Sequence, residues 1–162
     1  MKTNLILLVA MLLLLTACQR NPQQEPDQAD TVTWESAGYV METPADWADH
    51  FLINPAGDVH EENGLLFEIC HKETYQAGEV QGWVLSIVRW DETQYQTEKD
   101  ASELEVLATD DTGYYYCKCL PTDVQFTSEE TLKEMNEFRG SQELADVLAD
   151  FVSRNGLTAW TA

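Results

Sequence analysis

Hydrophobic and polar residues divide the chain into three stretches of different character. The first is a continuous apolar run from Leu5 to Leu15, and the second, residues 19–30, contains no apolar residue except Ala29. From about Val32 onward, apolar and polar residues alternate or recur at regular spacing, as they do in strands and helices that bury one face. The pattern therefore predicts one folded domain over residues 32–162, preceded by two segments that do not belong to it.

Short segments rich in β-branched and aromatic residues predict strands within this domain. In Trp83–Trp90 the apolar residues fall at both odd and even positions, which is typical of a central strand covered on both faces. The predicted strands are Thr33–Met41, Phe51–Ile53, Leu65–His71, Trp83–Trp90, Glu103–Thr109 and Tyr114–Leu120.

The last two of these segments are predicted to form a hairpin whose turn contains Gly113. A register that sets Glu105 opposite Lys118 gives the hairpin two distinct faces. One face carries Leu104, Val106, Ala108, Tyr115, Cys117 and Cys119, and the other carries Leu107, Tyr114, Tyr116 and Leu120.

Three helices are predicted, each after a serine or threonine: a short one through Trp47 and His50, and two C-terminal ones in which apolar residues recur every three to four positions. The predicted N-cap residues are Thr43, Thr127 and Ser141. Pro44 follows the first of them, where its fixed φ suits a first helical position, and Glu130 completes a capping box with the second. Strands combined with these helices predict an α+β fold, an antiparallel sheet packed with helices.

The N-terminal segment is typical of an export signal. Lys2 precedes an apolar run that is too short to span a bilayer and that fits a secretory leader. The residues Leu15-Thr16-Ala17-Cys18 resemble the lipobox of bacterial lipoproteins, which implies that residues 1–17 are removed and that Cys18 is lipidated. Two or more acyl chains hold a protein stably to a membrane. Residues 18–31 would then be the lipidated cysteine and a disordered tether, and we expect a cell-membrane, lipid-anchored, extracytoplasmic protein.

The charge of the chain limits its partners. It has 9 Lys and Arg against 29 Asp and Glu, a formal net charge of −20. Such a field repels nucleic-acid phosphates and favours basic proteins, polyamines or multivalent cations. We therefore expect no nucleic-acid partner and consider a basic envelope protein as a partner. Solubility and spacing from an anionic envelope would explain the charge equally simply.

Three cysteines follow the lipidated one, and strand geometry argues against a disulfide between Cys117 and Cys119. Residues two apart on a strand have Cα atoms about 6.5 to 7 Å apart, at or beyond the limit for a bridge. We predict that both are buried and reduced and act as small apolar residues. If Phe67 lies on the same face of the sheet as Cys117 and Cys119, Cys70 points to the opposite face, and a bridge from Cys70 to either of them would need a different packing. Cys70 and His71 are strand neighbours that point to opposite faces, so they cannot form a nucleophile pair.

No motif for catalysis or cofactor binding occurs in the sequence. It lacks a nucleophile elbow, a phosphate-binding glycine loop, a Ser-x-x-Lys motif, a His-Glu-x-x-His zinc motif and a calcium loop. The histidines are scattered and expected to face solvent, at His50, His60 and His71. We therefore expect no catalytic residue, no metal site and no cofactor. An enzyme with dispersed acids is the third hypothesis considered, with a pair drawn from Glu105, Asp110 and Asp111.

The tyrosine-bearing face of the hairpin is the candidate binding patch. It carries Tyr114 and Tyr116, with Trp90 on a neighbouring strand. If a helix covers this face, the residues are core aromatics, and the three predicted helices favour that alternative. If the face is open, the rings could dock a basic segment or an amine, with cation–π attraction of about 0.5 to 2 kcal/mol per ring.

Two short stretches resemble PsbP-like domains and related bacterial lipoproteins. They are GYVMETPADW at residues 38–47 and YYYCKCLPTDVQF at residues 114–126. The resemblance implies a PsbP-like layered α/β/α sandwich whose members mostly act as binding or assembly factors, and it brings no catalytic residue to this chain. We therefore expect a membrane-anchored, non-enzymatic surface lipoprotein that binds or helps assemble another envelope protein. The alternative is a solute or cation receptor that presents a small ligand to a transporter.

Overall fold

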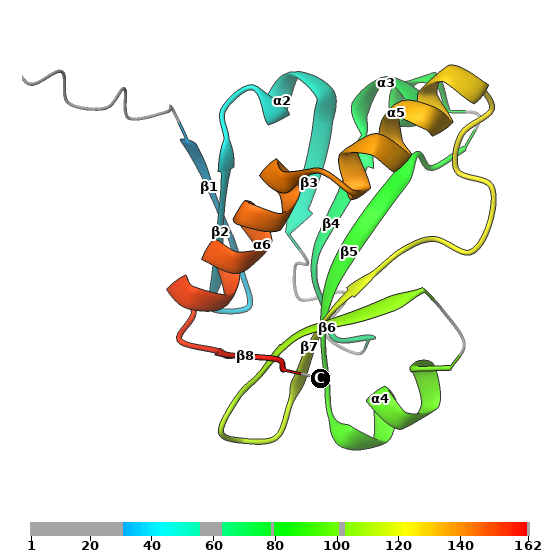
Figure 1. Cartoon of the computed structure of the whole chain (residues 1–162). Helices are drawn as coiled ribbons and strands as arrows, with labels where there is room; N and C mark the ends of the chain where they lie inside the picture. The colour runs from blue at the N-terminus through cyan, green and yellow to red at the C-terminus, as the bar shows by residue number, and fades with distance from the viewer. Residues whose placement is uncertain (1–30, 56–62, 79, 101–102, 162) are drawn as a thin grey trace, which may run out of the picture.

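The computed structural model describes residues 31–55, 63–78, 80–100 and 103–161 (Figure 1). The predicted leader, the lipidation site Cys18, the tether up to residue 30 and His60 lie outside these ranges. The first strand begins at Thr31, one residue before the predicted domain boundary. Within the described ranges, no helix has the length and apolar character needed to cross a bilayer.

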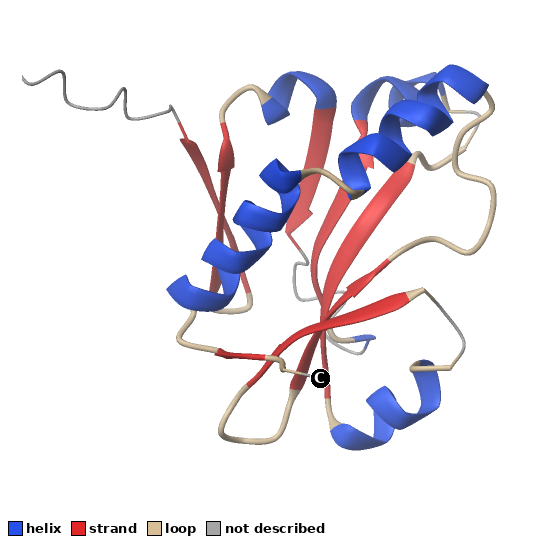
Figure 2. Cartoon of the chain, in the orientation of Figure 1, coloured by secondary structure: helices blue, strands red, loops and turns tan. Residues whose placement is uncertain are grey.

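In the described residues, six strands form one antiparallel sheet in the order β3-β4-β5-β7-β6-β8, and β1 and β2 form a separate two-stranded sheet. The strands are β1 Thr31–Ser36, β2 Tyr39–Pro44, β3 Phe51–Pro55, β4 Leu65–His71, β5 Trp83–Trp90, β6 Leu104–Thr109, β7 Tyr115–Cys119 and β8 Thr158–Ala159. The helices are α2 Trp47–His50, α3 Lys72–Ala77, α4 Glu92–Glu98, α5 Glu129–Arg139 and α6 Gln142–Arg154. This combination of helices and antiparallel strands confirms the predicted α+β class (Figure 2).

Both faces of the six-stranded sheet carry helices. On one face, α5, α6 and the β1-β2 hairpin close over a cluster that we call the main core, which includes Met41, Phe67, Ile87, Tyr116, Met135, Leu144 and Phe151. On the other face, α4 packs over a smaller cluster that we call the second cluster, which includes Val88, Trp90, Cys117 and Cys119. Tyr95 of α4 stacks on Tyr115 there, with ring centroids 4.1 Å apart. The central strand β5 is thus covered on both sides, as its sequence predicts.

The predicted register of the β6-β7 hairpin is confirmed at its open end and wrong near the turn. Glu105 pairs with Lys118 as expected, but a bulge at Leu107 shifts the ladder so that Ala108 pairs with Tyr116. An extra residue in one strand moves the later side chains to the opposite face. Ala108 therefore lies in the main core with Tyr116 instead of in the second cluster.

The first predicted strand is two strands. Thr33–Met41 is interrupted by a turn at residues 37 and 38, whose φ values of 49° and 83° are both positive, as a two-residue type I′ hairpin turn requires. β2 then continues through Thr43, so this residue is not the predicted N-cap, and α2 begins after Asp46. Thr43 Oγ1 instead accepts a hydrogen bond from Trp34 Nε1 at 3.1 Å inside the β1-β2 hairpin.

The two C-terminal helices are confirmed, with one shift in a cap. α5 is capped by Ser128 and not by Thr127, since Ser128 Oγ accepts from Thr131 N at 3.4 Å. α6 is capped by Ser141 as predicted, whose Oγ accepts from Leu144 N at 3.1 Å. The Ser141 cap fixes the start of α6, the helix that lines the groove described below.

Candidate functional site

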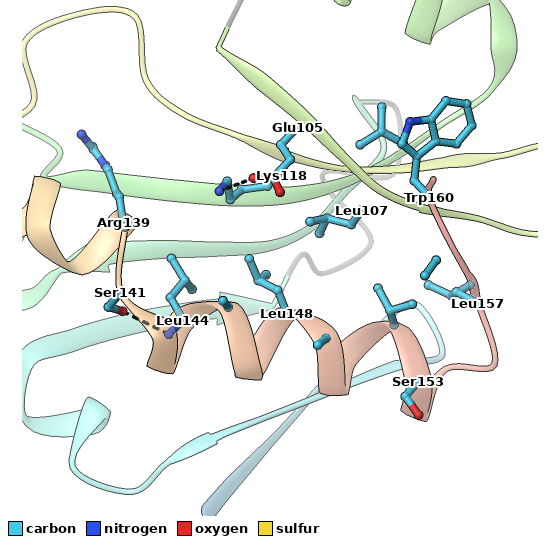
Figure 3. Close-up of a pocket in the computed structure, with 16 residues that line it drawn as sticks. Glu105, Leu107, Lys118, Arg139, Ser141, Leu144, Leu148, Ser153, Leu157 and Trp160 are labelled. Carbon is cyan, nitrogen blue, oxygen red and sulfur yellow. Dashed lines mark hydrogen bonds and ion pairs between the residues drawn. The ribbon is translucent and has the colours of Figure 1, made fainter. Parts of the chain in front are cut away.

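A groove of about 640 Å³ lies between α6 and the edge of the sheet formed by β6 and β8 (Figure 3). Its apolar lining comes from Leu107, Leu144, Leu148, Val152, Leu157 and Trp160. In Figure 3, Leu144 and Leu148 point from α6 towards the sheet, while Trp160 and Arg139 lie at opposite ends of the groove. Small, exposed residues of α6 line the groove as well, at Ala145, Ala149 and Ser153.

The chain builds this groove by reversing direction after α6. Gly156 has a φ of 65°, a conformation that glycine adopts at little cost after a helix end. The reversal brings β8 alongside β6, where Trp160 N donates to Leu107 O at 2.9 Å. One flank of α6 therefore faces β8, the strand that follows the helix directly along the chain.

Part of β6 has no strand on the groove side. β8 pairs only with Ala108 and Thr109, so Leu104–Val106 has no strand neighbour on this side among the described residues. Glu103 O accepts from Leu120 N on the β7 side. Because donors and acceptors alternate along an antiparallel strand, the backbone of Leu104 faces the open side. An unpaired strand edge beside an apolar groove is the geometry to which an extended peptide can add as a further strand.

The cations beside the groove are already bound within the protein. Lys118 Nζ forms an ion pair with Glu105 Oε2 at 2.5 Å, and the Lys118 side chain is only 14% exposed. Arg139 Nε donates to Val84 O at 3.0 Å, and burial lowers the pKa of its guanidinium. At the open edge Glu103 is exposed, whereas Glu105 is already paired with Lys118 although its side chain is 60% exposed. The free charge that a ligand meets there is negative.

The structure separates the predicted patch of Trp90, Tyr114 and Tyr116. Tyr116 is fully buried in the main core, whereas Trp90 is buried on the opposite face of the sheet, in the second cluster. The reason is the β5-β7 register, which pairs Trp90 with Tyr115 and so puts these two on one face. Tyr114 alone of the three is partly exposed. The predicted patch is therefore wrong as a single surface.

Tyr114 instead lines a second pocket, of about 520 Å³, together with Tyr39, Arg89 and Gln94. The Arg89 guanidinium lies over the Tyr114 ring, with Cζ 3.5 Å from the ring centroid. Sequence reasoning missed Arg89. The available signal was a single charged residue inside the segment Trp83–Trp90, which is apolar apart from Ser86.

Asp110 serves the hairpin turn and the buried tyrosine. Tyr116 Oη donates to Asp110 Oδ2 at 2.8 Å, and the carboxylate also accepts from Thr112 Oγ1 at 2.7 Å and Tyr114 N at 3.0 Å. Burial opposes ionisation of this carboxyl, but the hydrogen bonds outweigh burial and lower its pKa to about 2. Burial and the hydrogen bonds to Tyr39 and Asp110 raise the pKa of Tyr116. Asp110 thus stabilises the turn and the buried tyrosine. Its partners differ from that of Glu105, which forms an ion pair with Lys118.

The cysteines in the described residues, Cys70, Cys117 and Cys119, are free and buried. This confirms the prediction for Cys117 and Cys119, and burial raises the pKa of all three thiols to about 12. The prediction that Cys70 points away from Cys117 assumed that Phe67 and Cys117 lie on the same face of the sheet. Phe67 lies in the main core and Cys117 in the second cluster, so this assumption is wrong. Cys70 Sγ donates to Glu68 Oε1 at 3.3 Å. Buried thiols with raised pKa values are poor nucleophiles.

The histidines that the structure describes are not grouped. His50 is exposed as expected, but His71 is buried at 8% exposure, with Nδ1 2.7 Å from Thr74 Oγ1, so the prediction of a solvent-facing side chain is wrong for His71. The ring fits inside because Thr74 on the following helix provides a hydrogen-bonding partner. Within the described ranges, no group of three or more His, Cys, Asp or Glu side chains could hold a metal ion.

Comparison with known proteins adds no relative: a scan against family models, a search of curated proteins and a search of solved structures each gave no match. The fold and the site define an α+β domain with an open strand edge beside an apolar groove.

Proposed function

We propose that this chain is a non-enzymatic, lipid-anchored envelope lipoprotein whose domain binds an extended, basic segment of another envelope protein. The observation that carries the proposal is the unpaired edge of β6 beside the apolar groove. A segment placed there would bond to the backbone of Leu104 and rest alternate side chains against Leu148 and Trp160, because successive side chains of a strand point to opposite sides.

The charge of the domain supports a basic segment. Glu103 and Glu105 are exposed at the open edge, and the whole chain has a formal net charge of −20. Complementary charges speed association and oppose binding of acidic competitors, and both effects weaken as salt is added. The resemblance of residues 38–47 and 114–126 to PsbP-like domains also supports binding or assembly in preference to catalysis.

The lipobox-like residues 15–18 support the location of this binding event. A lipidated Cys18 followed by a polar tether would hold the domain at the extracytoplasmic face of a membrane. Segments of other envelope proteins would then be present at high local concentration, so a modest affinity for an extended segment would suffice.

Photo-cross-linking in cells tests the proposal. A photoreactive residue replacing Ala149, which is exposed and lines the groove, should cross-link to an extended basic segment of one envelope protein, identified by mass spectrometry. The matched control replaces Gln96, which is exposed on α4 on the other side of the sheet. Equal products from the two positions, or none from Ala149, would contradict the proposal.

A second pair of variants separates loss of binding from loss of folding. With the photoreactive residue at Ser153, Ala149→Trp should fill the groove and abolish the product, because its ring would occupy the space of the bound segment. Ala48→Trp, on an exposed position of α2, should leave the product unchanged. Raised salt should weaken the product of the unsubstituted domain. A product that persists in Ala149→Trp would mean that the segment does not bind in the groove.

A further inference from the structure

Arg89 differs from the other cations that the structure describes. Three of these pair with carboxylates and two donate to backbone oxygens, namely Lys118, Lys133 and Arg154 in the first group and Lys72 and Arg139 in the second. Lys99 is exposed. Arg89 is partly buried, yet among the described residues neither an ion pair nor a hydrogen bond engages its guanidinium. This is unexpected in a chain with 29 acidic residues.

The backbone and the guanidinium of Arg89 are each held by one contact. Its backbone N donates to Gly64 O at 2.7 Å, and its guanidinium lies on the Tyr114 ring at 3.5 Å from the centroid. Its Nε is buried without a hydrogen-bond partner in the described part of the chain, whereas its Nη atoms, also unpartnered there, are not buried. A guanidinium stacked on an aromatic ring keeps its planar fork of donors ready for a ligand.

Among the described residues that line this pocket, Arg89 is the positively charged hydrogen-bond donor. Tyr116 uses its only proton to bond Asp110, so the Tyr39 hydroxyl, 2.7 Å from Tyr116 Oη, donates to Tyr116 and can only accept from a ligand. Asp91 also lines the pocket, but its Oδ1 caps α4 by accepting from Gln94 N at 2.8 Å.

The apolar side chains of this pocket and the Arg89 guanidinium together indicate which kind of ligand the pocket can bind. Leu65 and Tyr39 line the same pocket, which has a volume of about 520 Å³ and therefore admits a small molecule. We infer that this pocket binds a small ligand through a carboxylate or phosphate oxyanion that accepts hydrogen bonds from the Arg89 Nη groups. The inference goes beyond the proposed function, because it concerns another pocket and a small ligand.

An NMR titration tests the inference, with benzoate and inorganic phosphate as probes at constant ionic strength. The Arg89 side-chain Nε–H signal and the backbone amides of Gly64 and Tyr114 should shift saturably with at least one probe, while sodium chloride should not reproduce the shift. Saturation by benzoate alone assigns a carboxylate ligand, and saturation by phosphate alone assigns a phosphate ligand. No saturable shift with either probe would overturn the inference.

Variants show whether Arg89 is the group that binds. Arg89→Gln should weaken binding at least about tenfold, because a charge-assisted hydrogen bond is lost. Arg154→Gln is the matched control and should bind as before, since Arg154 pairs with Glu42 and Asp150 away from the pocket. Arg89→Lys keeps the charge without the planar fork and should bind with intermediate affinity, which provides the answer if Arg89→Gln does not fold. Equal affinity in the Arg89 variants and the control would contradict the inference.

Discussion

The Tyr116 hydroxyl lies in the main core between two partners. It donates to Asp110 Oδ2 at 2.8 Å and accepts from the Tyr39 hydroxyl at 2.7 Å. A sequence pattern can place Tyr116 on a face of the hairpin, but it cannot show that an acid in the turn and a tyrosine 77 residues away satisfy its hydroxyl. The sequence favoured the core alternative on the number of helices alone, and the burial of Tyr116 confirms that alternative for this residue.

Tyr116→Phe should lower the free energy of unfolding by about 1 to 3 kcal/mol, because it leaves the Tyr39 hydroxyl and Asp110 each without one hydrogen bond. Urea denaturation followed by circular dichroism measures the loss. Tyr75→Phe is the matched control, since Tyr75 is 49% exposed, and should change stability little. Equal stability of the two variants would show that the buried hydroxyl contributes nothing.

The lowered pKa of Asp110 predicts a dependence of stability on pH. Its pKa is about 2 in the folded chain, against about 3.9 for an unperturbed aspartate. A carboxyl whose pKa is lowered by folding stabilises fully above the unfolded pKa, and the contribution is lost as the pH falls towards the folded pKa. The stability advantage of the unsubstituted domain over Asp110→Asn should therefore shrink between about pH 5 and about pH 3.

Urea unfolding of both proteins across that pH range measures the difference. Asp111→Asn removes a charge from the same turn at an exposed position and corrects for the change in net charge. A difference between the unsubstituted domain and Asp110→Asn that stays constant with pH would contradict the account of the Asp110 hydrogen bonds.

Elements with a strong local pattern were predicted well, and those that depend on distant contacts were not. The bounds of β5 match the predicted strand, because its apolar run is long and bounded by polar residues. α4 was missed, although Asp91 caps it, because Tyr95 is the only large apolar residue within it and gains its packing from Tyr115. β8 has two residues and is defined only by pairing with β6.

Two side chains join the end of α6 to β2: Arg154 pairs with Glu42 at the surface, and Asn155 bonds the β2 backbone. Asn155 Nδ2 donates to Val40 O at 2.8 Å, and Asn155 Oδ1 accepts from Val40 N at 2.9 Å. Asn155→Ala should therefore lower the free energy of unfolding by about 1 to 3 kcal/mol and speed hydrogen exchange at the Val40 amide. Asn136→Ala, which removes a contact between exposed side chains, should do neither. Unchanged exchange at Val40 would show that β2 is held by other contacts.

At the scale of the whole molecule, the groove could not be predicted because β6 is distant in sequence from the two consecutive elements, α6 and β8, that complete it. α6 provides one flank, β6 the other, and β8 limits how much of the β6 edge stays open. The bulge at Leu107 further changes which residues face α6. Of the predicted patch residues, only Tyr114 lines one of the two pockets discussed, and its neighbour Arg89 is the group with binding chemistry.

The lipid anchor is a separate prediction at this scale. The protein purified from membranes should begin at Cys18 and carry the mass of its acyl chains, and Cys18→Ser should lose that mass and the partition into detergent. Intact-protein mass spectrometry and phase partition measure both. Gln19→Ser is the control and should keep the acyl mass. A chain that retains residues 1–17 and carries no lipid would contradict the anchor.

Strand addition to β6 is the central claim, and hydrogen exchange of single backbone amides in the complex with the cross-linked partner segment tests it most directly. The Leu104 amide faces the open edge, so its exchange should slow by about tenfold or more when the segment binds. The Glu105 amide faces β7 and should exchange as before. Unchanged exchange at Leu104 in a complex shown to be saturated would contradict strand addition at this edge.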